Sequence, residues 1–115
     1  MKWMTASALL ILTAGCKPAQ RGAVCPDPQA VAPASIGAKA VTALTPVLAG
    51  PDRENEISEA IHRFRATDPT ISDDTVIDIM IAADCPNASP GADAATMKAR
   101  AGRLRAEVAG ILARE

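Results

Sequence analysis

The stretch SDDTVIDIMIAADCP, residues 72–86, decides the fold of this chain. It predicts a helix that begins after Ser72, whose hydroxyl can cap free backbone N–H groups, and that ends because Pro86 cannot continue it. The acidic residues of the first turn favour the positive end of the helix. Apolar side chains fall on nearly every side, so we expect this helix to be the central and most buried one.

Patterns on either side predict two further helices. The segment 52–67 has Asp52 as its expected N-cap, and its apolar residues recur at helical spacings. The last helix is expected to begin near Ser89 or Asp93 and to carry a single apolar stripe. This stripe consists of Met97, Ala101, Leu104, Val108 and Ile111.

A proline and two glycines affect the predicted helices. A short helix is expected over residues 36–44, and Pro46 should stop or kink it because proline lacks a backbone N–H. Gly102 and Gly110 fall inside the last helix, where glycine costs ~1 kcal/mol relative to alanine. We therefore expect both glycines to pack closely against a neighbouring element.

The amino terminus has the pattern of a bacterial signal peptide. No charged residue lies between Trp3 and Cys16, and the apolar run over residues 4–13 is roughly half the ~20 residues that span a bilayer. The run leads into LTAGC, residues 12–16, which resembles the lipobox of bacterial lipoproteins, although Thr13 stands where leucine is most frequent. The alternative is an ordinary secretory peptide in which Cys16 is incidental.

The lipobox resemblance implies a signal peptide over residues 1–15 and lipid on Cys16. Diacylglycerol on the thiol, with a further acyl chain such as palmitate on the new amino group, gives stable attachment where one chain would exchange. We expect a periplasm-facing lipoprotein of the bacterial cell envelope, and Lys17 favours the outer over the inner membrane. Residues 16–35 contain four prolines and are expected to form a flexible tether, followed by one helical domain over residues 36–115.

Two cysteines remain once Cys16 is assigned to lipid. Export places Cys25 and Cys85 in an oxidising compartment, and each precedes a proline, which places it at a turn or helix end. An intramolecular disulfide closing about 60 residues would stabilise the fold by ~4 kcal/mol in the chain-entropy model. Pairing between two molecules is the alternative.

Composition favours helices over sheets. Alanine occurs 25 times, tyrosine is absent, and Phe64 is the only aromatic residue after Trp3. A β-sandwich or barrel of this size would be expected to use more aromatic and β-branched residues. We predict an all-α fold: a small bundle of three to four helices, clamped by one disulfide, after the signal peptide and tether.

Part of the chain resembles a group of proteins. The chain contains the motifs IxxAI (57–61), PTIS (69–72) and VIDxMIAADCP (76–86), followed by a helix opened by Lys98. With these motifs it resembles a group of small exported alphaproteobacterial proteins of unknown function. Asp84 stands where those proteins often have the tyrosine of Ala-Ala-Tyr-Cys-Pro. The resemblance covers roughly half of the chain and implies an exported helical domain, but no activity. In architecture alone, the chain is also similar to small periplasmic acid-stress chaperones, which are helical and clamped by a disulfide.

Candidate catalytic and metal-binding residues are few. Glu59 and His62 form a Glu-x-x-His pair, but a di-iron bundle needs two such pairs and His62 is the only histidine. A triad that used Ser58 would depend on the same His62 as its base. The sequence has no glycine-rich phosphate loop. We therefore predict no catalytic residue, no metal, no cofactor and no small-molecule substrate, and hence no enzyme.

Charge is distributed unevenly along the chain. Residues 52–93 carry ten acidic and three basic side chains, a net charge of −7, whereas residues 98–115 carry five basic and two acidic ones, a net charge of +3. We favour attraction between these segments within the bundle; the alternative is a basic last helix that faces anionic lipid or an acidic partner. Because no aromatic residues are interleaved with the basic ones, we expect no nucleic-acid binding.

Two functions fit these features. The first, which we favour, is a non-enzymatic domain that is held on the membrane and binds or scaffolds another envelope protein. The alternative is a periplasmic acid-stress chaperone-like binding module. Acid would neutralise the ten carboxylates of residues 52–93 and leave a net positive charge that destabilises the compact state.

Overall fold

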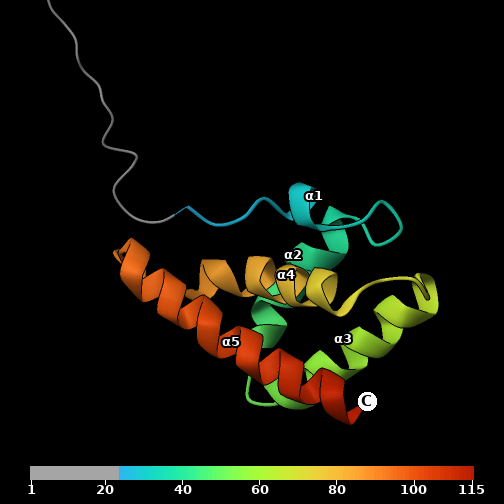
Figure 1. The fold of residues 1–115 in the computed structure, drawn as a ribbon. Helices are drawn as coiled ribbons and strands as arrows, with labels where there is room; N and C mark the ends of the chain where they lie inside the picture. The colour runs from blue at the N-terminus through green and yellow to red at the C-terminus, as the bar shows by residue number, and fades with distance from the viewer. Residues whose placement is uncertain (1–23) are drawn as a thin grey trace, which may run out of the picture.

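Helix α4, Asp73–Asp84, runs through the middle of the structure, a computed structural model that describes residues 24–115 (Figure 1). Ser72 is its N-cap, and the Ser72 Oγ accepts a hydrogen bond from the Thr75 N–H at 3.1 Å. The helix leads into a short 3₁₀ turn, η3 (Cys85–Asn87), which contains Pro86. Seven residues of α4 are buried, which confirms the predicted central helix: Val76, Ile77, Ile79, Met80, Ala82, Ala83 and Asp84.

Helices α3 (Arg53–Thr67) and α5 (Ala94–Arg114) confirm the two longer sequence patterns. Asp52 occupies the N-cap position of α3, but its carboxylate accepts a hydrogen bond from the Asn55 side chain instead of a backbone N–H. Asp93 caps α5 and accepts a hydrogen bond from the Thr96 N–H at 2.8 Å, so the later of the two expected starts is right. The buried residues of α3 are those at the predicted spacings: Ile57, Ala60, Ile61 and Phe64.

The apolar stripe of α5 is buried unevenly. Leu104, Val108 and Ile111 lie in the core, whereas Met97 and Ala101 are only partly buried. Both side chains line an opening between α5, the end of α4 and the amino-terminal segment, so α4 covers them incompletely. Part of the apolar face of α5 is therefore left outside the core.

Helix α2, Ala38–Leu48, continues through Pro46, so the stop that was one of the two expected effects of this proline does not occur. The proline removes the hydrogen bond that the Thr42 carbonyl would accept within the helix. Both residues are exposed, so water can satisfy this carbonyl. Leu48 is only 1% exposed, and its burial favours the additional turn after the proline.

The segment before α2 corrects the predicted tether. Residues 28–31 form a short helix, α1 (Pro28–Val31), and the Asp27 carboxylate caps it by accepting a hydrogen bond from the Gln29 N–H. Val31 and Ala32 pack against the core, so residues 24–35 belong to the folded domain instead of forming an extended tether. Residues 1–23, with the predicted signal peptide, the predicted lipid site and the first part of the tether, lie outside the described residues.

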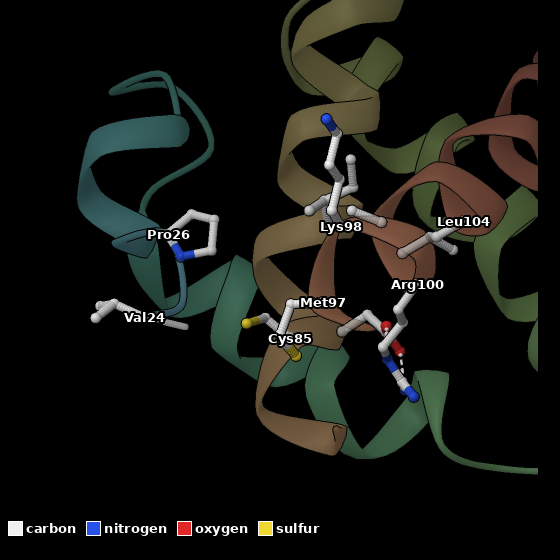
Figure 2. Close-up of a pocket in the computed structure, with 10 residues that line it drawn as sticks. Val24, Pro26, Cys85, Met97, Lys98, Arg100 and Leu104 are labelled. Atoms are coloured by element: carbon white, nitrogen blue, oxygen red, sulfur yellow. Dashed lines mark hydrogen bonds and ion pairs between the residues drawn. The ribbon is translucent and has the colours of Figure 1, made fainter. Parts of the chain in front are cut away.

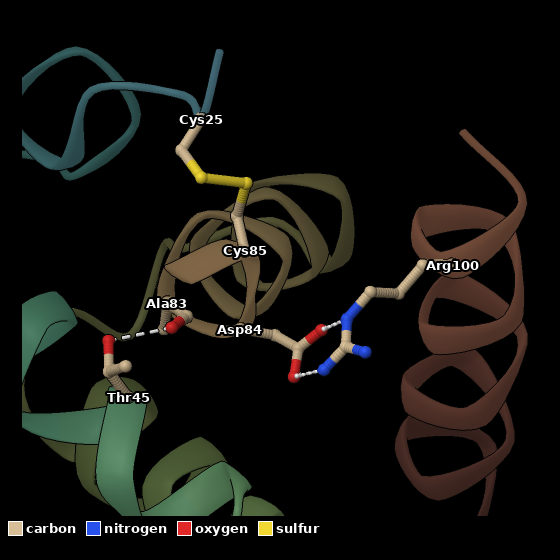
Figure 3. Close-up of a disulfide and its surroundings, with 6 residues drawn as sticks. All are labelled: Cys25, Thr45, Ala83, Asp84, Cys85 and Arg100. Carbon is tan, nitrogen blue, oxygen red and sulfur yellow. Dashed lines mark hydrogen bonds and ion pairs between the residues drawn. A yellow bond between two sulfur atoms is a disulfide. The ribbon is translucent and has the colours of Figure 1, made fainter. Parts of the chain in front are cut away.

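The predicted pairing of Cys25 with Cys85 is present. The Cα atoms lie 5.6 Å apart, and the bond joins residues separated by 60 positions. It ties the start of the described chain to the end of α4 (Figure 3). The all-α, disulfide-clamped fold is therefore confirmed for residues 24–115, which contain no strand, although α1 raises the number of α-helices to five.

The glycines of α5 do not pack as expected. A Cβ added at Gly102 would meet nothing within 4 Å, and one at Gly110 would meet only the Arg114 side chain at 3.9 Å. The predicted close packing is wrong, because Gly102 lies on the exposed side of α5.

Replacing Gly102 with alanine should raise the free energy of unfolding by up to ~1 kcal/mol, because alanine restricts the unfolded chain and fits the helix without a clash. Urea denaturation followed by circular dichroism measures the change. Gly37→Ala is the matched control and should destabilise the fold, because Gly37 has φ +84°. A loss of stability in Gly102→Ala would contradict the structure of this face.

Candidate functional site

A groove opens between the amino-terminal segment, the end of α4 and the first half of α5 (Figure 2). Its cavity volume is about 180 Å³, which is below the ~300–1,000 Å³ of small-molecule pockets. The groove is therefore of a size that accepts one apolar side chain. Its lining is mostly apolar and consists of Val24, Pro26, Ile81, Cys85, Met97, Ala101 and Leu104, with Asp84, Lys98 and Arg100 as the charged members.

The floor of the groove contains a buried carboxylate. Asp84 is 3% exposed and is the one buried charged residue in the described part of the chain. Arg100 donates from Nε to Oδ2 at 2.7 Å and from Nη2 to Oδ1 at 3.0 Å, which is the two-pronged geometry that guanidinium and carboxylate favour (Figure 3). The pair fixes the first half of α5 to the end of α4.

Arg53 extends this pair into a cluster of four charges. Its Nη1 lies 3.8 Å from the Asp84 Oδ1 and donates to the Leu48 carbonyl at 3.3 Å. Its Nη2 donates to Glu107 of α5 at 2.7 Å, and the hydrogen bonds to Glu107 are the largest cause of the raised pKa of Arg53, against which burial acts. The cluster therefore joins the end of α2, the start of α3, the end of α4 and the middle of α5.

Two neutral hydrogen bonds hold the end of α4 on another side. The Thr45 hydroxyl of α2 donates to the Ala83 carbonyl at 2.7 Å, and the Asn87 side chain of η3 donates to the Thr45 carbonyl at 2.8 Å. With the disulfide at Cys85, the last turn of α4 is connected to the amino-terminal segment, to α2 and to α5 (Figure 3). This wall of the groove is thus held by one covalent bond and several hydrogen bonds within the domain.

The role of Asp84 as a buried ion-pair partner was not among the features predicted from the sequence. Its position at the end of the most apolar helix is the sequence feature that could have indicated this role, because a charged residue that is buried needs a partner. Of the predicted site residues, Cys25 and Cys85 are brought together, and Cys16 lies outside the described residues.

The residues considered for catalysis are arranged differently from a triad. The His62 Nε2 lies 2.6 Å from one oxygen of Glu115, and the Ser58 hydroxyl donates to the other oxygen at 2.9 Å. The carboxylate thus lies between the hydroxyl and the imidazole, whereas a nucleophile must donate to its base directly. Across residues 24–115, no group of three or more His, Cys, Asp or Glu side chains is placed to hold a metal ion.

The acidic segment and the last helix attract each other, as the sequence analysis favoured. Besides Arg100, Arg105 of α5 lies 3.7 Å from Asp78 of α4, and Arg114 pairs with Glu54 of α3. Lys98 and Arg103 are the cations of α5 that form no ion pair with the part of the chain that the structure describes.

No protein-family model, curated protein or solved structure matches this chain. Among the helices that the structure describes, none is both long and apolar enough to cross a membrane.

Replacing Arg100 with methionine should lower the free energy of unfolding by ~3 kcal/mol, because it leaves Asp84 buried with only the more distant Arg53. This loss of ~3 kcal/mol is at the low end of the values for breaking a buried ion pair. The reason is that the Arg100 side chain is 32% exposed, so solvent screens its charge. Urea denaturation followed by circular dichroism measures the loss.

Two further variants control this prediction. Arg103→Met removes an exposed cation of the same helix and should change stability by less than ~0.5 kcal/mol. The double variant Asp84→Leu, Arg100→Met removes both charges and should regain most of the loss. A double variant no more stable than Arg100→Met would show that an unpaired carboxylate is not the cause.

Proposed function

We propose that this protein is a cell-envelope lipoprotein, anchored by lipid on Cys16, whose helical domain binds or scaffolds another envelope protein without catalysing a reaction. The anchor lies on the periplasmic side of a bacterial membrane, with the outer membrane favoured by Lys17.

The Cys25–Cys85 disulfide is the observation that carries the proposal. A structural disulfide supports an exported protein, because cytosolic thiols are kept reduced. It uses the second and third cysteines of the chain and leaves Cys16, which directly follows the small residues Ala14 and Gly15 at the end of the apolar run. A lone remaining cysteine at that position fits the lipid-modified residue of a lipoprotein.

The groove supports the binding role. Its walls are fixed by the disulfide and by the Asp84–Arg100 pair, so little conformational entropy is lost when a partner side chain enters. Its small volume and apolar lining favour a protruding side chain of a partner protein over a substrate.

Protein purified from envelope membranes should begin at Cys16, and its amino-terminal peptide should carry the mass of diacylglycerol and a further acyl chain. Cys16→Ser should release the protein from the membrane fraction, whereas the double variant Cys25→Ser, Cys85→Ser should keep the lipid. An unmodified Cys16, or cleavage at another position, would remove the anchor from the proposal.

Photo-crosslinking in the same envelope membranes tests whether the groove binds a partner protein. A photo-crosslinking residue at Ala101 lies in the groove, and one at Ala106 lies on the exposed side of the same helix. We expect a protein adduct of discrete mass from position 101 and none from position 106. Equal labelling from both positions, or none from either, would contradict binding in the groove.

The ion-pair cluster favours a second candidate, an acid-stress chaperone-like module. Arg53 and Arg100 are partly buried and each depends on a carboxylate of the cluster, so breaking these ion pairs would loosen α5. Loss of the α5 contacts would expose the apolar stripe that the chaperone would use to bind unfolded chains. This function thus depends on the same four residues that hold the native fold.

Acidification should destabilise the fold, and the sign follows from the lowered pKa values of two carboxylates. The pKa of Asp68 is lowered mainly by the hydrogen bond from the Thr70 hydroxyl, and that of Asp93 mainly by the Thr96 N–H. Their contribution is therefore present above the unfolded pKa of ~3.9 and is lost as the pH falls through the lower folded values. Circular dichroism from neutral pH to about pH 2 measures this loss of stability.

A chaperone would also suppress the aggregation of a client protein at about pH 2.5. If the protein does not suppress this aggregation, the chaperone candidate is removed.

A further inference from the structure

We propose that the first half of α5 lies against an anionic phospholipid surface, held there by Lys98 and Arg103. The inference rests on the lipid anchor at Cys16 proposed above. It concerns how the anchored domain is oriented, because attachment itself comes from the acyl chains.

The length of the chain before the domain limits how far α5 can be from the membrane. Val24 is the eighth residue after Cys16, and an extended chain spans at most ~3.5 Å per residue, or about 28 Å. The described chain enters the domain on the side where α5 begins, and the carboxyl end of α5 lies at the opposite end (Figure 1). Anchoring therefore leaves the first half of α5 able to reach the headgroups, and the charges of the domain decide whether it lies against them.

The cations on this half of α5 are available for lipid. Arg100 and Arg105 pair with acidic residues of α4, whereas Lys98 and Arg103 are exposed and form no ion pair with residues 24–115. They are five residues apart, which places them about 140° apart around the helix, on the two flanks of its exposed face. The sequence between Cys16 and Val24 adds two basic residues, Lys17 and Arg21, and no acidic one.

The other exposed charges are divided between the two ends of the domain. Glu59 of α3 and Asp74 of α4 are exposed acids without an ion pair in the described chain, and α3 packs on α5 near its carboxyl end (Figure 1). At the end where α5 begins, the exposed carboxylates of Asp27 and Asp93 accept hydrogen bonds as the caps of α1 and α5, so the attraction to an anionic surface rests on Lys98 and Arg103. Val24, which is 80% exposed, adds an apolar side chain where the described chain begins, on the opposite side of the groove from Lys98 (Figure 2).

Lysine acetylation on vesicles tests this orientation. The mature lipidated protein is reconstituted into vesicles of phosphatidylcholine alone or with about one-third phosphatidylglycerol, and flotation first shows whether it is anchored. We expect Lys98 to be acetylated roughly threefold more slowly on the anionic vesicles, and this protection to vanish near 1 M salt, where the screening length is ~3 Å. Lys39, an exposed residue of α2, is the internal control and should react equally on both vesicles.

Matched charge reversals complete the test. Arg103→Glu should abolish the protection of Lys98, whereas Arg63→Glu, an equal change at an exposed and unpaired residue of α3, should leave it. Flotation without protection of Lys98 on anionic vesicles would overturn this inference and leave the anchor standing. Protection of Lys98 on neutral vesicles as well would assign this face to a second copy of the chain instead of lipid. Failure to float on either vesicle would overturn both the anchor and this inference.

Discussion

The buried carboxylate of Asp84 constrains most of the structure. A charge at 3% exposure is tolerated only with close counter-charges, so Arg100 of α5 and Arg53 of α3 must lie where they do. Glu107 then balances Arg53, and one cluster sets the positions of three helices relative to one another. An apolar core of alanine and branched aliphatic residues permits several registers, whereas a two-pronged ion pair permits very few.

The last turn of α4 is the point at which the covalent and ionic constraints meet. Asp84 and Cys85 are neighbours, so the ion pair with α5 and the disulfide to the amino-terminal segment act on the same turn. The groove lies between these two attachments, and its shape depends on both of them. A small domain with few aromatic residues thus keeps a groove of defined shape without a large core.

Local information was sufficient to predict most of the helices. The caps at Ser72 and Asp93 and the apolar spacings placed α4 and α5, and the assignment of Cys16 to lipid left one intramolecular pair to form. The errors concern tertiary contacts. Helix α2 continues through Pro46 because the carbonyl that loses its hydrogen bond faces solvent. Residues 24–35 belong to the fold because the disulfide and the core hold them. Neither solvent exposure nor these contacts can be read from the local sequence pattern. The Asp84–Arg100 pair was missed for the same reason, since it depends on the register between α4 and α5.

The disulfide also determines how the domain bears mechanical load. A pull on the amino-terminal segment enters the domain at Cys25 and passes through the sulfur atoms directly to Cys85. Helices α1, α2, α3 and α4 lie inside the covalently closed loop, so tension along the chain cannot unravel them. Only the part after Cys85, which is η3 and α5, can be drawn out, and the ion pairs of Arg100 and Glu107 then resist the force. Under load from a membrane, this protein would extend from its carboxyl-terminal helix alone.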